Sequence, residues 1–233
     1  MNGTGSAKTR SQRPPIMSAP VRRSAWVVPT GLVLLSLIPI LAGALRLTEL
    51  SSGAAVTADN ERFFGSPIPV VIHIVSATVF AMLGAFQFVS APSGTRIRWH
   101  RTTGRVVVPA GLFAGLSGLW MTVFYSLPPN DGPLLLWFRL VFGVAMVVSI
   151  ALGTRAIVQR QFARHGAWMT RAYAVGVAAG TQAIVLTAAE LIAGPPDLTS
   201  RALLMGASWL LNLAIAEYII QRRAFVGRRH ALT

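Results

Sequence analysis

Long apolar segments alternate with short polar connections along most of the chain. Six of these segments are long enough to cross a hydrocarbon core of about 30 Å as helices. They are residues 26–45, 68–89, 106–127, 134–158, 172–193 and 202–220. Because their apolar residues are consecutive and do not alternate with polar ones, the pattern predicts helices and not a β-barrel. The predicted fold class is therefore all-α, a polytopic membrane protein with six transmembrane helices over residues 25–221.

The composition agrees with a membrane protein. Hydrophobic residues make up 53% of the 233 residues and charged residues only 12%, whereas a soluble domain carries about 25% charged residues. The net charge of +14 comes from basic residues that separate apolar segments. They form no basic stripe with interleaved aromatics, which argues against nucleic acid as a partner. The chain has no cysteine, which excludes disulfides and thiolate sites.

The two ends of the chain are polar and basic. Residues 1–24 cannot bury a core, so we expect a disordered tail; a cleaved signal peptide is disfavoured because the first apolar segment is long enough to span. Residues 222–233 form a basic C-terminal tail. Most Lys and Arg residues lie in these tails and around the connections before the third and fifth apolar segments. The positive-inside rule therefore places both termini and both connections on the cytoplasmic side of the cell membrane.

Those two basic connections resemble each other. Each contains one histidine beside an arginine, His100 and His165. Aligning the histidines superposes the glycines that follow them, Gly111 and Gly115 on Gly176 and Gly180. At about 100° per residue, the first glycine shares a helix face with its histidine. The repeat predicts two parallel hairpins related by a pseudo-two-fold axis, with helices two to five as a four-helix core. Close helix packing also explains any single glycine pair.

The two histidines are candidate ligands for a cofactor. If they faced each other across the bundle axis, they would suit the iron of a b-type haem, and the glycines would leave room for the macrocycle. Nearby arginines would pair with the propionates or another anion; they are Arg101, Arg105, Arg164 and Arg171. However, each histidine precedes its apolar segment by a stretch that corresponds to roughly 9–10 Å. The other interpretation is that these residues bind lipid phosphates.

A second candidate site lies in the opposite half of the predicted bundle. His73, Arg139 and Glu190 fall inside apolar segments, where ionisable groups are costly unless they are paired or line a wet cavity. A pair of Arg139 and Glu190 beside His73 would bind a quinone-like carbonyl or relay protons. Alternatively, Arg139 reaches to the interface and Glu190 is hydrated at its helix end. Both interpretations are open.

Polar residues on the last apolar segment have a structural interpretation. Asn212 is near mid-membrane and needs a partner helix, and Glu217 is expected to pair with Arg105 or Arg171. The chain contains no zinc-protease, Walker or nucleophile-elbow motif. The sequence therefore gives no indication of hydrolytic or nucleotide chemistry.

Several short motifs carry a family resemblance over residues 68–220. They are His73-Ile74-Val75, Gly84-Ala85-Phe86-Gln87-Phe88, Trp99-His100-Arg101-Thr102-Thr103-Gly104-Arg105, Arg164-His165-Gly166-Ala167-Trp168-Met169-Thr170-Arg171 and Trp209-x-x-Asn212-x-x-x-x-Glu217. With them the chain resembles an uncharacterised bacterial membrane family, catalogued as domain of unknown function 2306, which implies no assigned activity.

More distantly, the chain is similar to the ascorbate-reducible cytochrome b class of six-helix proteins. Those proteins hold two haems, each between histidines on helices two and four or three and five. The resemblance implies that His100 and His165 are the pair on helices three and five. Arg139 stands where His73 would need a histidine partner, so the resemblance implies one haem b only.

The leading hypothesis is a cytoplasmic-membrane electron-transfer protein or oxidoreductase. It would hold one haem at His100 and His165 and act on a quinone-like substrate near His73. The alternatives are a cofactor-free membrane protein that binds or transports a lipid or small molecule, and a structural subunit of a membrane complex.

Overall fold

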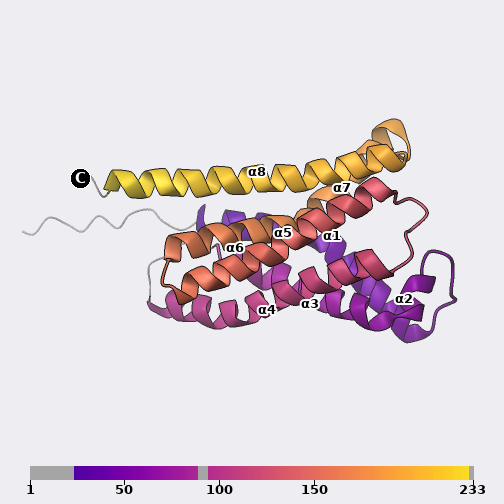
Figure 1. The fold of residues 1–233 in the computed structure, drawn as a ribbon, viewed down its shortest axis with the longest axis horizontal. Coiled ribbons are helices and arrows are strands. Elements are labelled where there is room, and N and C mark those ends of the chain that lie inside the picture. The colour runs from indigo at the N-terminus through magenta and orange to yellow at the C-terminus, as the bar shows by residue number, and fades with distance from the viewer. Residues whose placement is uncertain (1–23, 89–93, 231–233) are drawn as a thin grey trace, which may run out of the picture.

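The computed structural model describes residues 24–88 and 94–230, and within them the regular structure is helical throughout (Figure 1). The helices are α1 (Ser24–Ser52), α2 (Glu61–Gly65), α3 (Pro67–Phe86), α4 (Gly94–Phe124), α5 (Pro133–Val158), α6 (Phe162–Gly176), α7 (Ala178–Ala193) and α8 (Leu198–His230). Six stretches are long and apolar enough to cross a membrane, with α6 and α7 together forming the fifth. The predicted all-α, six-span fold is confirmed.

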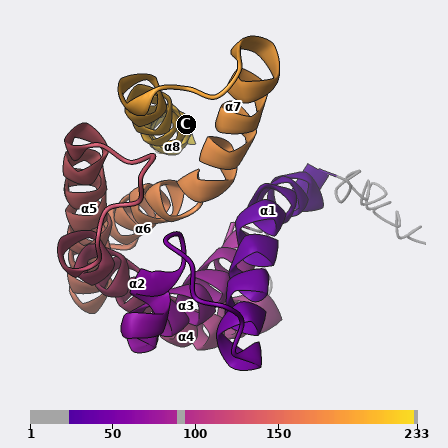
Figure 2. The same ribbon diagram turned by 90° about the vertical axis from the view of Figure 1, so that its right-hand side faces the viewer.

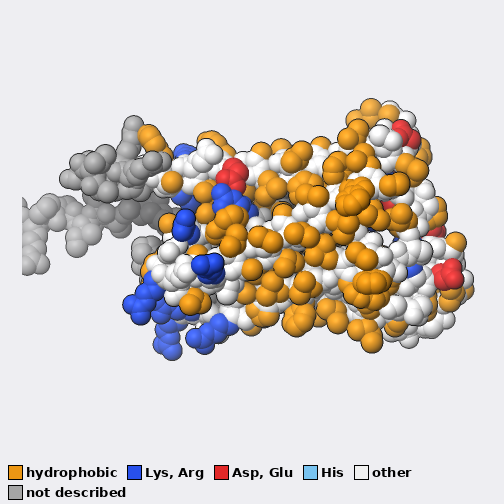
Figure 3. All heavy atoms as spheres, viewed as in Figure 1, with side chains coloured by type: hydrophobic (Ala, Val, Ile, Leu, Met, Phe, Trp, Pro, Cys, Tyr) orange, Lys and Arg blue, Asp and Glu red, His pale blue; other side chains and the backbone are white. Residues whose placement is uncertain are grey.

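Charge separates the two ends of the bundle. In Figure 3 most visible Lys and Arg side chains gather at one end, and most acidic side chains lie at the other. We call the first the basic end, where α4 and α6 begin, and the second the loop end, which holds α2 and residues 125–132. A hydrophobic belt separates them in Figure 3. Many large apolar side chains of the described residues are exposed, Ile192 to 85%. Soluble proteins rarely expose such a surface, so the belt is the lipid-facing surface. That the basic end is cytoplasmic stays a prediction.

Four spans form the core, as the repeat predicted. The buried cluster draws its side chains from α3, α4, α5 and α6, with Val177 beside them. Helix α1 packs against α3 and α7, and α8 packs against α5, α6 and α7. In the most apolar window of each helix, 11% of the first span is buried and 33% of the second. The first span is therefore a peripheral helix.

The helices at the basic end are longer than their apolar segments. Helix α4 begins at Gly94 and α6 at Phe162, so both candidate histidines lie inside helices and not in connections. Arginine is a good helix former, which lets a helix continue past the apolar stretch. Helix α8 likewise continues to His230 through the segment expected as a tail. Of the predicted N-terminal tail, residues 1–23 lie outside the described residues.

The fifth span is divided at Val177. Its carbonyl accepts a hydrogen bond from the Gly180 N–H at 3.1 Å, three residues on, where an α-helix bonds four residues on. This tighter turn separates α6 from α7, which run in different directions in Figure 2. The break lies beside the cavities described below and gives their walls residues from both helices.

Phe80 of α3 fills the point where the repeated glycines meet. A Cβ added at Gly111 would lie 2.6 Å from its ring, and a Cβ at Gly176 would lie 2.6 Å from its other side. The ring is only 2% exposed. Because neither glycine has a side chain, the single ring of Phe80 fits between Gly111 on α4 and Gly176 on α6. The space expected to remain for a macrocycle is occupied by Phe80.

Candidate functional site

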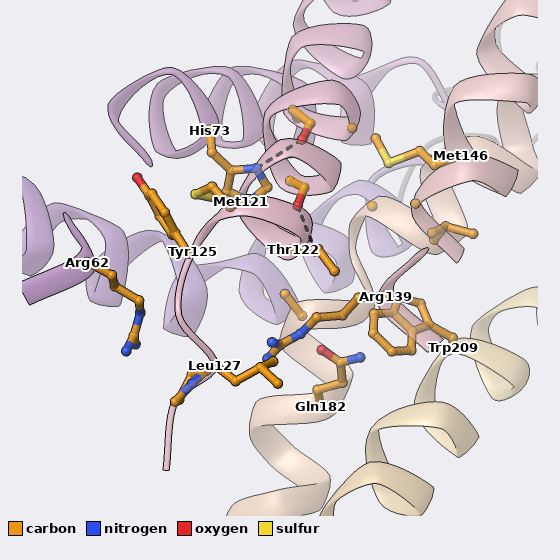
Figure 4. A pocket seen from close by; sticks show the side chains of 18 of the residues that line it. Arg62, His73, Met121, Thr122, Tyr125, Leu127, Arg139, Met146, Gln182 and Trp209 are labelled. Carbon is orange, nitrogen blue, oxygen red and sulfur yellow. Dashed lines mark hydrogen bonds between the residues drawn. The ribbon is translucent and has the colours of Figure 1, made fainter. Parts of the chain in front are cut away.

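A cavity of about 340 Å³ lies at the loop end of the core (Figure 4). Its volume falls in the range of small-molecule sites, about 300–1,000 Å³. Seven polar side chains line it: Arg62, His73, Thr122, Tyr125, Ser126, Arg139 and Gln182. Figure 4 shows His73 on one side, and Arg139, Gln182 and Trp209 on the other. The structure therefore brings together two of the three residues predicted for a substrate or proton site.

His73 has a defined tautomer. Its Nδ1 lies 2.9 Å from the backbone oxygen of Ala114 on α4. A carbonyl only accepts, so in the neutral imidazole Nδ1 carries the hydrogen and Nε2 presents a lone pair. The neighbouring Ser117 hydroxyl, 3.3 Å from Nδ1, donates to the Phe113 carbonyl. A Cβ at position 118 would lie 3.2 Å from the ring, so the lack of a side chain at Gly118 leaves room for the imidazole.

Arg139 is held by Asp131, and the expected pair with Glu190 is not formed. Arg139 Nη2 lies 2.6 Å from Asp131 Oδ2, and Arg201 Nε lies 3.1 Å from Asp131 Oδ1. The Asp131 side chain is 2% exposed. Glu190 is exposed on α7 and has no ion pair with a described residue. One carboxylate thus serves two guanidinium groups, which leaves excess positive charge beside the cavity.

Arg62 of α2 adds a further positive charge to the cavity wall. Its guanidinium lies 4.5 Å from the centre of the Phe63 ring, as does that of Arg46. Burial, and then the charge of Arg46, lower the pKa of Arg62 from its usual value. Arginine keeps its proton at neutral pH even so. This end of the cavity therefore favours a ligand with an electron-rich or anionic oxygen.

The remaining walls combine an amide with apolar surface. Gln182 Nε2 donates to the Met205 carbonyl at 3.3 Å, which leaves its Oε1 without a hydrogen-bonding partner among the described residues. Trp209 stacks on Phe142, with ring centres 4.8 Å apart. Met146, which belongs to the buried core cluster, also lines the cavity. A flat apolar ligand in this cavity would pack against an aromatic wall and would have polar protein groups at the edges of its ring.

His100 and His165 lie on α4 and α6 at the basic end, close enough to interact electrostatically. His165 Nδ1 donates to the Gly153 carbonyl at 2.9 Å, leaving Nε2 available. His100 is exposed, and neither this cavity nor the second one described below is lined by either histidine. The donor atoms suit a haem, but Phe80 occupies the glycine faces expected to receive it. Phe80 thus fills the space in which the sequence predicted a haem, and no step below depends on that group.

The arginines near the histidines differ in their partners. Arg171 binds Glu217 through two hydrogen bonds of 2.5 and 2.9 Å, which confirms the predicted pairing and leaves this arginine engaged. Arg164 donates a hydrogen bond at 3.0 Å to the side-chain oxygen of Gln161, the residue just before α6. Arg101, Arg105 and Arg164 are all exposed. These three remain accessible to an anion.

Asn212 finds the partner helices that the sequence required. Its Nδ2 donates to the Ala174 carbonyl at 3.1 Å, and its Oδ1 accepts from the Thr181 hydroxyl at 3.0 Å. The asparagine therefore joins α8 to both parts of the divided fifth span. These contacts are of the kind that the sequence predicted for a polar residue near mid-membrane.

The sequence did not single out Asp131, Tyr125 or Arg62 as site residues. Arg62 and Asp131 belong to connections that hydropathy assigns to water, and Tyr125 lies near the end of the apolar segment 106–127. One signal was present: Asp131 is an acid just before α5, about two helical turns before Arg139 of that helix. No group of three metal-ligating side chains occurs among the residues that the structure describes.

Fold and cavity define a polytopic helical membrane protein with a polar-edged cavity in one half of its core. The chain belongs to the family catalogued as domain of unknown function 2306 and described as a predicted membrane protein, whose model matches residues 70–220. No curated protein and no solved structure matches the chain. The family covers the four core helices and most of α8, including every wall of the cavity except α2.

Proposed function

We propose that this protein binds a small, flat, lipophilic molecule of the quinol type in the cavity at the loop end. The observation that carries the proposal is the pairing of His73 and Arg139 on opposite walls of one cavity. By the positive-inside rule the cavity faces the external side. Of the functions that the sequence left open, the cavity supports small-molecule binding without a cofactor.

The hydrogen-bonding groups favour a molecule with a donor at one edge and an acceptor at the other. Neutral His73 presents the Nε2 lone pair, which accepts from a hydroxyl group. Arg139 bonds Asp131 through one nitrogen and has further N–H donors for a carbonyl, phenolate or ring oxygen. A quinol in the reduced form satisfies both ends. An oxidised quinone offers only acceptors and would leave Nε2 unpaired.

That difference gives a redox-state preference as the test. Leaving a buried polar group unpaired costs about 1–3 kcal/mol, so the reduced ring should bind about tenfold more tightly than the oxidised ring. The full-length protein in nanodiscs would be titrated calorimetrically without oxygen. The probe is dimethoxy-methyl-benzoquinone without a side chain, compared with its quinol.

Two variants make the test specific. His73→Phe removes the acceptor, so the affinity ratio of quinol to quinone should fall to near one. Glu190→Gln, on an exposed side chain away from the cavity, should leave the ratio unchanged. A wild-type ratio near one, an unchanged ratio in His73→Phe, or no binding of either form would overturn the proposal. A merely structural role of His73 would weaken both forms equally.

A further inference from the structure

A second cavity of about 160 Å³ lies directly behind His73. Five residues line both cavities: His73, Ala114, Met146, Gly176 and Ala179. The other walls of the second cavity come from α1, from the middle of α3 and from the break between α6 and α7. The two spaces therefore meet at His73, one toward the loop end and one toward mid-membrane.

The second cavity has mainly apolar walls. Ile40, Ile74, Ala77 and Phe80 belong to them. The polar members besides His73 are Ser36 and Thr78, and the Ser36 hydroxyl already donates to the Leu32 carbonyl at 2.8 Å. Apolar cavities of about 150 Å³ stay dry and take up apolar molecules. The chemistry of these walls is that of a hydrocarbon site.

Helix α1 forms the side of this cavity next to the lipid. It is the peripheral helix, and it contacts the core at two glycine positions. A Cβ at Gly43 would lie 2.8 Å from Ile74, and a Cβ at Gly180 would lie 2.0 Å from the backbone oxygen of Leu35. The cavity includes residues between these contacts. A chain in the cavity therefore lies under α1, within reach of the bilayer.

We propose that the second cavity holds a hydrocarbon chain attached to the ring that lies in the first cavity. This inference rests on the proposed function and narrows its ligand class to quinols with an alkyl or isoprenoid side chain. Since lipid is as apolar as the cavity wall, the chain contributes through close packing. An acyl chain of a bilayer lipid has the same chemistry, and the test below distinguishes the two sources.

The experiment compares a ring with and without a chain. Probes are dimethoxy-methyl-benzoquinol and the same quinol with a decyl chain, both titrated into the full-length protein in nanodiscs. Ala77→Phe fills the second cavity from α3, and Ile40→Trp fills it from α1. Val75→Phe is the matched control on α3, because Val75 is 51% exposed on the lipid-facing side. Partition of the decyl quinol into lipid is the same for all variants and cancels in comparisons.

We expect Ala77→Phe and Ile40→Trp to weaken the decyl quinol about tenfold, or about 1.4 kcal/mol, with the tailless quinol changed less than about twofold. Val75→Phe should change neither. If both filled variants bind both quinols as the wild type does, or weaken both equally, the chain is not in this cavity, while ring binding stands. An acyl chain of the bilayer would give the former result. If the wild type binds neither quinol, the proposed function itself fails.

Discussion

Replacing Gly180 with alanine should separate α1 from α7. Pro39 lies inside α1 and has no N–H, so the Leu35 carbonyl, one turn earlier, lacks its helical partner. That carbonyl approaches α7 at Gly180, where a Cβ would lie 2.0 Å from the oxygen. The contacting atom is backbone, so no side-chain rotation relieves the overlap. The whole helix must move.

The size of the effect follows from that distance. An ordinary contact begins at 3.4 Å, so α1 must recede by about 1.4 Å, the difference from 2.0 Å. Overpacking costs about 1–3 kcal/mol, and a radial gap of 0.5–1 Å already removes about a quarter to a half of a contact's attraction. We expect a loss of about 3 kcal/mol in the free energy of unfolding. For a chain of this length that corresponds to about 6–12 °C in Tm.

The assay is thermal unfolding of the purified protein in mild detergent. Gly104→Ala is the control, because Gly104 also lies inside a helix but a Cβ there meets nothing within 4 Å. It should leave Tm unchanged or raise it, since alanine stabilises a helix by about 0.5–1 kcal/mol over glycine. If Gly180→Ala unfolds within about 2 °C of Gly104→Ala, which is under 1 kcal/mol, the close contact of α1 and α7 does not exist as described.

Three further predictions concern charges and the basic end. Asp131→Asn should lower the free energy of unfolding by about 1.5–3 kcal/mol, because it removes the charge that two arginines bind. Asp59→Asn, at an exposed position, is the control. Equal Tm values for the two variants would contradict the buried pairing. Backbone and hydroxyl donors lower the pKa of Asp197, so its stabilisation is complete above about pH 4, its unfolded pKa, and is lost as pH falls through the folded pKa. The Tm difference between wild type and Asp197→Ala should therefore shrink below that pH, and a constant difference would contradict the assignment. Because Phe80 fills the space between the repeated glycines, we expect protein from haem-supplied cells to show no Soret band; a Soret band lost in His165→Ala would instead establish the haem.

Hydropathy predicted the number of spans and their order, and the repeat of histidines and glycines predicted the four-helix core. It underestimated helix length at the basic end, because arginines that end an apolar segment do not end a helix. It also gave no sign that Val177 divides the fifth span, since that break is a change of hydrogen-bonding partner within an apolar run.

The sequence likewise predicted part of the candidate site and missed the rest. Ionisable residues inside apolar segments identified His73 and Arg139, because such residues are costly in lipid wherever the fold places them. The predicted partner of Arg139 was wrong, since the arginine binds Asp131 in the connection before α5, and that carboxylate also binds Arg201 of α8. The sequence determines what each segment can tolerate around it, which is a local energy. Only the tertiary structure decides which groups meet across the bundle, as with Phe80 between two distant glycines.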